Sequence, residues 1–451
     1  MLKSAAAGAL TFALGLVAYP AFAKVSAEEA ARLSAELTPV GAERAASQDG
    51  SIPAWTPAQQ RGPITGVYPA DAAIDAEKPL FTITLGNAAQ YTDKLSAGHR
   101  ELLRRFPTYK MNVYPAHRQV AFLDFVYAAT IANATSCELI GTDNPQNCKV
   151  GFTFPIPKSG AEVIWNHKVK WRGDGVARYN NQLIVQPSGE YQLTKLLEEA
   201  NFYYATRINP VPLTRDTALF LKYLSETMQP PRVAGTILLV HERAGSGNEG
   251  RQAWLYSPGL KRIRRAPSAC CDNPVEGTDG HQFFDQIDMF NGILDRYNWK
   301  IVGKREIYIP YNSNLIGSPK VKYASLARPK HLNQDLPRYE LHRVWVVDAE
   351  LRPGTSHTLK KRRFYVDEDS WQIVLVDGYD NRDQLYQFQE GHLVFFQNIL
   401  GTVTVPEVIY HLDSGRYFVT ALANEDKPND YSKRFDENHF EASTVQKRST
   451  R

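Results

Sequence analysis

The sequence predicts an α+β fold in which an antiparallel meander of strands curls on itself. Short strand-like segments follow one another between residues 236 and 389, and turns rich in glycine, proline and aspartate separate them. Helical signals come mainly before position 150. The alternation of strands with long helices that is typical of a doubly wound parallel sheet is absent from the sequence.

The first residues have the pattern of a secretory signal peptide. Lys3 gives a basic start, residues 5–18 form an apolar run, and Ala21-Phe22-Ala23 fits the small-residue cleavage rule. The run is shorter than the roughly 20 residues that span a bilayer. We therefore expect a signal peptide over residues 1–23, cleavage after Ala23 and a mature chain free in the periplasm.

Residues 24–150 are expected to be mostly helical and extended and to pack on the sheet. Ser26 fits a helix N-cap, because Glu28 and Glu29 follow it in the first turn. Further helices are predicted over residues 86–105 and 117–134. The segment has too little apolar periodicity for a core of its own, so we interpret it as part of a lid rather than a separate domain.

Residues 151–420 are expected to form the curled sheet. The pattern predicts a strand over 162–172, strands within 180–206, and a helix over 216–228 that ends before Pro230. Strands are then predicted over 236–243, 252–256, 261–265, 299–309, 339–348, 359–366, 372–379 and 384–389. Residues 311–338 are interpreted as a surface loop and 421–451 as a loose polar tail.

Charge argues against a nucleic-acid partner, because a formal net charge of +4 is small for 451 residues. Basic clusters at 261–265 and 360–363 lie in strand-like sequence, which favours a solvated strand face over a binding patch.

The four cysteines fall into two pairs. Cys137 and Cys148 flank a turn-like segment and predict a disulfide in an oxidising compartment, where closing a loop of this size stabilises by about 3 kcal/mol. Cys270 and Cys271 are adjacent, so they either form a strained ring or stay reduced and buried, and the sequence does not choose. Cysteine and histidine spacings typical of zinc are absent, so we predict no metal and no cofactor.

Candidate catalytic residues are few. Asp285, Asp288 and Asp295 lie close together in the sequence and could bind calcium or act as an acid/base pair, but their spacing favours caps and turns. Single histidines occur at His167, His241, His281, His342 and His357. Neither a nucleophile elbow nor a His-Glu-x-x-His helix accompanies them, so we predict no catalytic residue and no enzyme.

Tryptophans mark the meander. Trp254, Trp345 and Trp371 lie in or beside predicted strands. Packing on one sheet face is the favoured interpretation, and the alternative is the wall of a cavity that binds an apolar ligand. For that cavity the candidate residues are Leu238 and Val240 together with these three tryptophans.

Two segments resemble a known family. Residues 252–265 resemble a strand–turn–strand of the LolA/LolB group of periplasmic lipoprotein carriers, and residues 364–374 resemble a later hairpin of that group. More of the chain resembles a large proteobacterial family usually labelled outer-membrane lipoprotein-sorting-like, through residues 154–157 with 164–167, 290–300, 302–306 with 310–312, and 350–357.

The resemblance implies an unclosed, LolA/LolB-like β-barrel with helices over its mouth. It also implies a hydrophobic cargo, peripheral membrane contact, and partners such as an inner-membrane export pump and an outer-membrane protein. The chain is about twice as long as a simple lipoprotein carrier and lacks the lipid anchor of the outer-membrane receptor. A lipid or sterol-like molecule is therefore as well supported as lipoprotein acyl chains.

Three hypotheses about function follow. The first is a periplasmic carrier or adaptor for a hydrophobic molecule. The second is a partner subunit of an envelope export pump that binds no cargo, which a filled interior would favour. The third is a hydrolase of envelope lipid or glycan, which ionisable groups with perturbed pKa values inside a cavity would favour.

Overall fold

The computed structural model describes residues 24–57, 71–205, 219–245, 250–397, 399–431 and 433–448. The expected signal peptide and its cleavage after Ala23 fall outside these ranges. None of the helices within them combines the length and the hydropathy needed to cross a bilayer.

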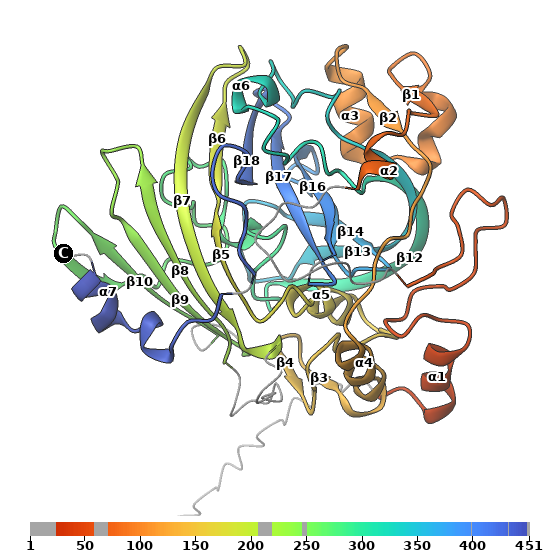
Figure 1. Ribbon diagram of the computed structural model, residues 1–451, viewed down its shortest axis with the longest axis horizontal. Coiled ribbons are helices and arrows are strands. Elements are labelled where there is room, and N and C mark those ends of the chain that lie inside the picture. The colour runs from red at the N-terminus through yellow and green to blue at the C-terminus, as the bar shows by residue number, and fades with distance from the viewer. Residues whose placement is uncertain are drawn as a thin grey trace, which may run out of the picture.

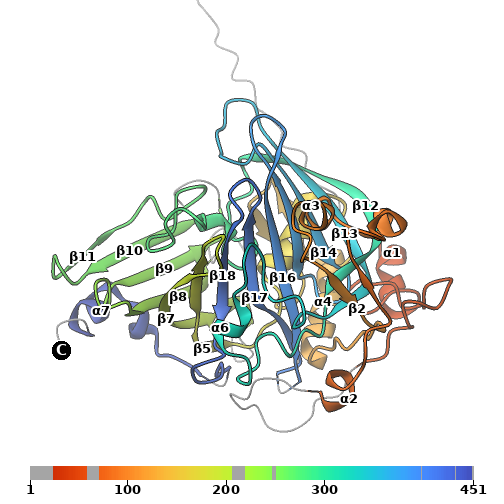
Figure 2. The same cartoon turned by 90° about the horizontal axis from the view of Figure 1, so that it is seen from above.

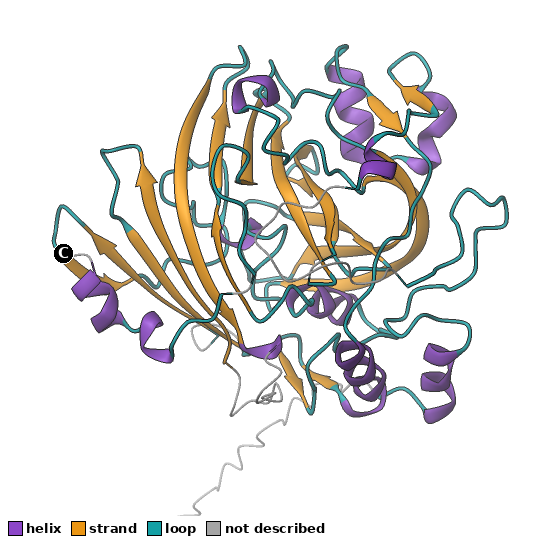
Figure 3. Ribbon diagram, in the orientation of Figure 1, coloured by secondary structure: helices purple, strands orange, loops and turns teal. Residues whose placement is uncertain are grey.

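Most strands belong to one curved antiparallel sheet, shown in Figures 1 and 3. Its order is β1-β2-β13-β14-β15-β16-β17-β18-β6-β7-β8-β9-β10-β11, while β12 also pairs with β13 and β5 with β7. No pairing within the described ranges joins the two ends, so the sheet is not closed. The predicted fold class, α+β with an unclosed antiparallel sheet, is confirmed.

The strands of the larger half of the sheet are β1 (Phe81–Ile83), β2 (Met111–Val113), β12 (Tyr297–Pro310), β13 (Tyr339–Leu351), β14 (Lys361–Asp367), β15 (Ile373–Tyr379), β16 (Leu385–Phe396), β17 (Gly401–His411) and β18 (Arg416–Leu422). The smaller half contains β5 (Gly175–Tyr179), β6 (Asn181–Val185), β7 (Tyr191–Phe202), β8 (Leu219–Gln229), β9 (Ile237–Arg243), β10 (Arg251–Ser257) and β11 (Arg262–Arg265). A separate hairpin pairs β3 (Glu138–Ile140) with β4 (Asn144–Gln146).

The α-helices are short and lie around the sheet. They are α1 (Ala27–Ala31), α2 (Ala72–Asp75), α3 (Ala97–Arg105), α4 (Asp124–Ser136), α5 (Gly160–Lys168), α6 (Tyr323–Leu326) and α7 (Ala442–Arg448). The predicted N-cap at Ser26 is confirmed, since its side chain accepts a hydrogen bond from the Glu29 amide at 3.0 Å. The helix predicted over 86–105 is a 3₁₀ segment followed by α3, and the helix predicted over 117–134 begins later, at Asp124.

The N-terminal part shares its core with the sheet. Strands β1 and β2 extend the sheet beyond β13. In α3, the amide groups of Ala97 and Gly98 donate to the Asp377 carboxylate on β15. Gly98 also lies against the Phe388 ring, where a Cβ would come within 2.0 Å of a ring carbon. Because this helix has no room for a side chain at that point, it lies directly on β15 and β16.

The strand predicted over 162–172 is wrong, because residues 160–168 form α5 and residues 169–172 form no strand. Ser159 and Glu162 form a reciprocal capping box that starts the helix. All residues of α5 are buried. A helix that is enclosed on every side has no side that faces solvent, and its polar side chains bond to protein groups instead. Its sequence therefore lacks the helical period of apolar and polar residues that predicts a surface helix.

The helix predicted over 216–228 is also wrong from residue 219 onward, because residues 219–229 form β8, while 216–218 lie outside the described ranges. This strand lies between β7 and β9, where both backbone edges are hydrogen-bonded. Pairing with two long neighbours outweighs the weak local preference of the segment for a helix.

Two segments interpreted as loose are folded. Residues 311–338 contain α6 and bury Ile316 and Leu332 completely, so they are not a polar surface loop. The region assigned to a loose tail from 421 onward instead completes β18 at Leu422 and then forms η6 (Glu437–Phe440) and α7. Phe440 and Val445 are buried at 0% and 1% exposure.

Candidate ligand-binding site

The site is a cavity in the smaller half of the sheet. We call the side of β7–β10 that looks toward β17 and β18 the inner face, and the opposite side the outer face. The cavity lies between the inner face and the loop formed by residues 266–291, which we call the covering loop. Its volume is about 240 Å³, and a deeper space of about 80 Å³ shares several lining residues with it, including Leu238 and Tyr223.

Strand register places the lining residues in rows across the inner face. Arg178 on β5 is aligned with Glu198 on β7, then with Ser225, Leu238 and Leu255 on β8, β9 and β10. The next row is Val176, Ala200, Tyr223, Val240 and Ala253. Alternate residues of a strand point to opposite faces, so these rows fix which side chains can meet a ligand.

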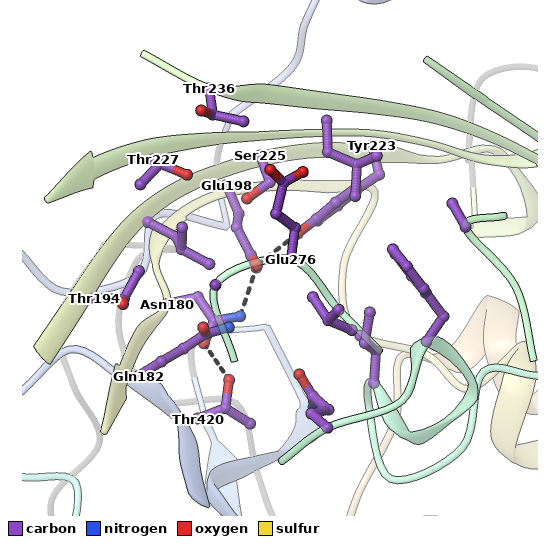
Figure 4. A pocket seen from close by; sticks show the side chains of 18 of the residues that line it. Asn180, Gln182, Thr194, Glu198, Tyr223, Ser225, Thr227, Thr236, Glu276 and Thr420 are labelled. Carbon is purple, nitrogen blue, oxygen red and sulfur yellow. Dashed lines mark hydrogen bonds between the residues drawn. The ribbon is translucent and has the colours of Figure 1, made fainter. Parts of the chain in front are cut away.

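A polar cluster centred on Glu198 forms one wall (Figure 4). The Glu198 carboxylate, 3% exposed, accepts hydrogen bonds from Asn180 Nδ2 at 2.6 Å and the Tyr223 hydroxyl at 2.5 Å, both drawn in the figure. It also accepts from Arg178 Nε at 2.8 Å. Thr420 on β18 donates in turn to Asn180 at 2.8 Å. Burial, and then the charge of Glu198, raise the pKa of Tyr223 well above its usual value. The hydroxyl therefore stays protonated and keeps donating.

Polar groups that could meet a ligand surround this cluster. Within the described ranges, the structure records no hydrogen bond from the two Nη atoms of Arg178, which lines the cavity. Thr194, Thr227 and Thr236 add hydroxyl groups to the same wall, as Figure 4 shows. This end of the cavity can therefore hydrogen-bond a hydroxyl, carbonyl or other polar group.

Ion pairs of Asp288, a residue of the covering loop, form another part of the cavity wall. One Asp288 carboxylate oxygen accepts from Lys170 Nζ at 2.7 Å and from Arg172 Nη1 at 2.8 Å. Burial alone would raise the pKa of Asp288, but the charges of Arg172 and Lys170 outweigh it and hold the pKa well below its usual range. Asp288 and Met289 have φ angles of 58° and 62°, an uncommon left-handed pair of non-glycine residues that fixes this bend of the covering loop.

Glu407 on β17 lies beside Asp288 in the cavity wall. Its carboxylate accepts from the Met289 amide at 3.1 Å and from the Thr404 hydroxyl at 2.8 Å. Burial, and then repulsion from Asp288, raise the pKa of Glu407 to about 7. This group therefore changes its protonation state near neutral pH.

The deeper part of the cavity is apolar on several sides. Phe220, Leu238, Val240, Phe284 and Ile287 line it. Among the charged side chains there, Arg251 Nε donates to Glu242 at 2.5 Å, and Lys168 Nζ donates to the Gly292 carbonyl at 2.7 Å. The cavity is thus amphipathic, with a polar wall at Glu198 and an apolar interior.

Further contacts hold the covering loop in place. Asp285 accepts from Arg362 on β14 at 2.6 Å and is bonded to His357 at 3.0 Å. Arg251 on β10 donates to the Asn291 carbonyl at 2.7 Å. The loop therefore connects the two halves of the sheet across the cavity.

Of the predicted cavity residues, Leu238 and Val240 line the cavity and the three tryptophans do not. Trp254 is paired with Leu239, so it lies on the outer face against His241. Trp345 stacks on Trp371 with ring centroids 6.1 Å apart, beneath Val40 of the N-terminal part. Packing, the interpretation that the sequence favoured, accounts for all three.

The three aspartates singled out in the sequence do not form a carboxylate cluster. Asp285 and Asp288 face different cations, and Asp295 lies beside a separate hollow with Arg296. The local sequence pattern does not single out Arg178, Asn180, Glu198 or Tyr223. Asn180 and Glu198 lie in the strand-like stretch 180–206, whose polar residues are interpreted as gaps between strands, whereas Arg178 precedes this stretch and Tyr223 lies in the predicted helix 216–228.

The candidate histidines have structural partners. His167 is buried between the Asp288 carbonyl and the Ile373 amide, and burial lowers its pKa to about 3. His342 lies with Asp367 and Asp369 in a buried group that could hold a metal ion. Both oxygens of Asp369 already accept from Arg118, at 2.8 and 2.6 Å, and this guanidinium would repel a cation.

The cysteines differ in state. Cys137 and Cys148 form a disulfide next to the β3–β4 hairpin. Cys270 and Cys271, in the covering loop, are free thiols whose sulfur atoms lie 2.7 Å apart. Both thiols are unbridged, as in the reduced alternative, but they are half-buried rather than buried.

Comparison with known proteins gives a family match. The family model described as "Protein of unknown function (DUF1329)" matches residues 82–446. An uncharacterised protein of Pseudomonas aeruginosa is 42% identical over 425 residues, which cover 92% of each chain.

Solved structures with similarity to this chain have low sequence identity. A DUF1329 family protein from Desulfovibrio piger has a TM-score of 0.41 and 14% identity, covering 60% of this chain and 92% of that one. A putative outer-membrane lipoprotein-sorting protein domain from Vibrio parahaemolyticus has a TM-score of 0.42 and 14% identity, covering 63% and 97%. A LolA superfamily protein from Nitrosomonas europaea has a TM-score of 0.38 and 11% identity, covering 63% and 98%.

Proposed function

Since the chain belongs to the DUF1329 family, whose description names no activity, we propose from its own geometry that it binds an amphipathic molecule and carries it through the periplasm. The ligand would be a lipid, an acyl chain or a sterol-like molecule with one polar end. Handover to an inner-membrane export pump and an outer-membrane protein is the route that the sequence resemblance implies, and it is part of this proposal.

The amphipathic cavity carries the proposal. An apolar chain gains about 0.8 kcal/mol for each methylene group that leaves water. The side chains around Leu238 and Val240 offer that environment. The polar end of the ligand would meet the Arg178 guanidinium and the threonine hydroxyls near Glu198. A ligand without a polar group would leave these donors unpaired, which disfavours a pure hydrocarbon.

The test starts with mature protein purified from periplasm without detergent. Native mass spectrometry and organic extraction should reveal a bound amphipathic molecule that denaturation releases. Leu238→Gln with Val240→Gln should weaken uptake of a fluorescent fatty-acid probe by at least about tenfold, because each change buries an amide in the apolar end. Leu85→Gln is the matched control, since Leu85 is 53% exposed and outside the cavity. Protein free of ligand that also takes up no probe would favour the pump-subunit hypothesis.

A second candidate, an enzyme acting on the bound molecule, is favoured by one observation. Glu407, with its pKa raised to about 7, lines the cavity beside Asp288, and buried acid/base groups of this kind are typical of catalytic sites. An experiment can distinguish an enzyme from a carrier. The extracted ligand is incubated with native protein and with the Glu407→Gln variant, and mass spectrometry then detects any products. Turnover by the native protein but not by the variant would establish the enzyme hypothesis. Unchanged ligand in both samples would support the carrier hypothesis.

A further inference from the structure

Two hairpin tips lie side by side at one end of the cavity. The β8–β9 tip (residues 228–236) and the β10–β11 tip (residues 257–265) form the left edge of the molecule in Figures 1 and 2. They are in contact, since a Cβ on Gly235 would lie 3.3 Å from Pro258. Val233 and Thr236 of the first tip line the cavity, and so does Leu255, just before the second. We call these two tips the hairpin edge.

The hairpin edge is strongly cationic. Residues 257–271 contain no Asp or Glu, and neither do residues 227–241. Five cations in these stretches are exposed, namely Arg232, Lys261, Arg262, Arg264 and Arg265. None of the five has an ion pair within the part of the chain that the structure describes.

The same edge exposes apolar side chains. Met228 and Leu260, one at each tip, are 42% and 50% exposed. Large apolar side chains that project beside lysine and arginine are typical of proteins that bind the surface of an anionic bilayer. From the sequence alone, the interpretation of residues 261–265 is a solvated strand face, because the sequence does not reveal the neighbouring tip or the cavity.

Strand register connects the cations to the cavity. Arg264 is paired with Leu255, which lines the cavity, and Arg262 is paired with Ser257. These two arginines therefore lie on the inner face, at the rim of the cavity. Arg265, on the outer face, lies over the Trp254 ring at 4.9 Å.

We propose that the hairpin edge docks onto membranes rich in anionic phospholipid, with the cavity rim against the headgroups. Met228 and Leu260 would enter the headgroup layer while the five cations contact phosphate groups. An amphipathic ligand could then pass between bilayer and cavity without crossing bulk water. This inference rests on the proposed function for its purpose, but membrane docking is measured separately.

An acidic protein is the competing partner, because β11 ends the sheet and its outer edge has no neighbouring strand among the described residues. The exposed Met228 and Leu260 lie at the hairpin tips rather than along that edge. Binding to an anionic lipid surface accounts for both the charges and the apolar tips. An acidic protein that adds a strand to β11 would use only the backbone of β11.

The experiment is co-sedimentation of the full mature chain with vesicles of phosphatidylcholine alone or mixed with phosphatidylglycerol. The chain should bind the mixed vesicles and be released by high salt. Combined Lys261→Glu, Arg262→Glu and Arg264→Glu should weaken binding at least about a hundredfold. Leu260→Ser should weaken it less and should keep the salt dependence.

Matched controls come from exposed residues elsewhere in the chain. Lys320→Glu with Lys322→Glu changes charge at α6, and Leu315→Ser removes a side chain that is 45% exposed. Both should bind mixed vesicles as the native chain does. Circular dichroism and fatty-acid probe uptake, measured on every variant, show whether the fold and the cavity are intact.

Three outcomes would overturn the docking proposal. They are native protein that stays in the supernatant, equal binding to both kinds of vesicle, and full binding by the charge-reversed variant. Probe uptake by the same samples still decides the proposed function, so the two can fail independently. Capture of an acidic protein by a chain that ignores vesicles would assign the hairpin edge to the competing partner.

Discussion

Glu198 and Glu407 are buried carboxylates of one cavity in different surroundings. Glu198 contacts a guanidinium, an amide and a phenol, so its negative charge is compensated where it lies. Glu407 contacts a hydroxyl and a backbone amide and has Asp288 nearby. Burial without a contacting cation favours the neutral acid. At the residue scale, the cavity thus combines a carboxylate that contacts three hydrogen-bond donors with a carboxyl group whose pKa is raised to about 7.

Glu407→Gln should alter how stability depends on pH. The folded pKa of about 7 exceeds the ordinary value of 4.5, so the folded state binds more protons between these values. Stability from this group is present below about pH 4.5 and is lost as pH rises through 7, by at most about 3 kcal/mol. Urea unfolding at about pH 5 and pH 8 should show a smaller loss for the variant than for native protein. Equal losses in both proteins would contradict the assignment.

The thiol pair should react asymmetrically. A hydrogen bond from Cys271, aided by Arg296 and Arg251, lowers the pKa of Cys270 to about 6. At neutral pH we expect iodoacetamide to modify Cys270 quickly and Cys271 slowly. Mass spectrometry of peptides at successive times measures this. Cys271→Ser is the control and should slow the reaction of Cys270, whereas a protein without any titratable thiol would indicate the strained ring instead.

At the scale of elements, the outer face of the smaller half depends on the C-terminal helices. Phe440 and Val445 pack on Leu239 and Tyr256, while His241 bonds the Phe440 carbonyl at 2.8 Å. These contacts cover the face opposite the cavity. The C-terminal segment therefore supports the strands that carry the lining residues.

Phe440→Ala should destabilise this element without changing the cavity wall. Removing a fully buried phenylalanine costs about 3–5 kcal/mol. Urea unfolding should show this loss, and hydrogen exchange of β9 and β10 amides should speed up. Ser443→Ala, at an exposed position of α7, is the matched control. If both variants have the same free energy of unfolding, the C-terminal segment contributes little to the stability of the smaller half.

On the scale of the whole molecule, one sheet has two parts that differ in how their inner space is filled. The larger half is packed with side chains from α3, α5 and the N-terminal part, all in one continuous core. The smaller half is covered by the loop 266–291, and that arrangement leaves the cavity. The loop is held to both halves through Asp285 and Arg251. The larger half is thus packed with side chains, whereas the smaller half is hollow.

The sequence by itself determined the fold class, most strands of the meander, the N-cap at Ser26 and the family. Each depends on local signals, namely turn residues, alternating strand patterns and recognisable segments. It also singled out Leu238 and Val240 as cavity residues, but it grouped them with three tryptophans that do not line the cavity. Residues 162–172 and 219–229 were misassigned because tertiary enclosure and pairing with β7 and β9, not local preference, decide their conformation.

Only the tertiary structure decided which side chains form the cavity. A shift of one residue along a strand reverses its faces, so the register of β9 with β10 separates Leu238 from Trp254. Glu198 meets Asn180 because β6 and β7 pair as a hairpin, and it meets Arg178 because β5 pairs with β7. Asp288 reaches Lys170 across more than a hundred residues of chain. Local sequence patterns cannot encode such contacts, since long-range packing sets them.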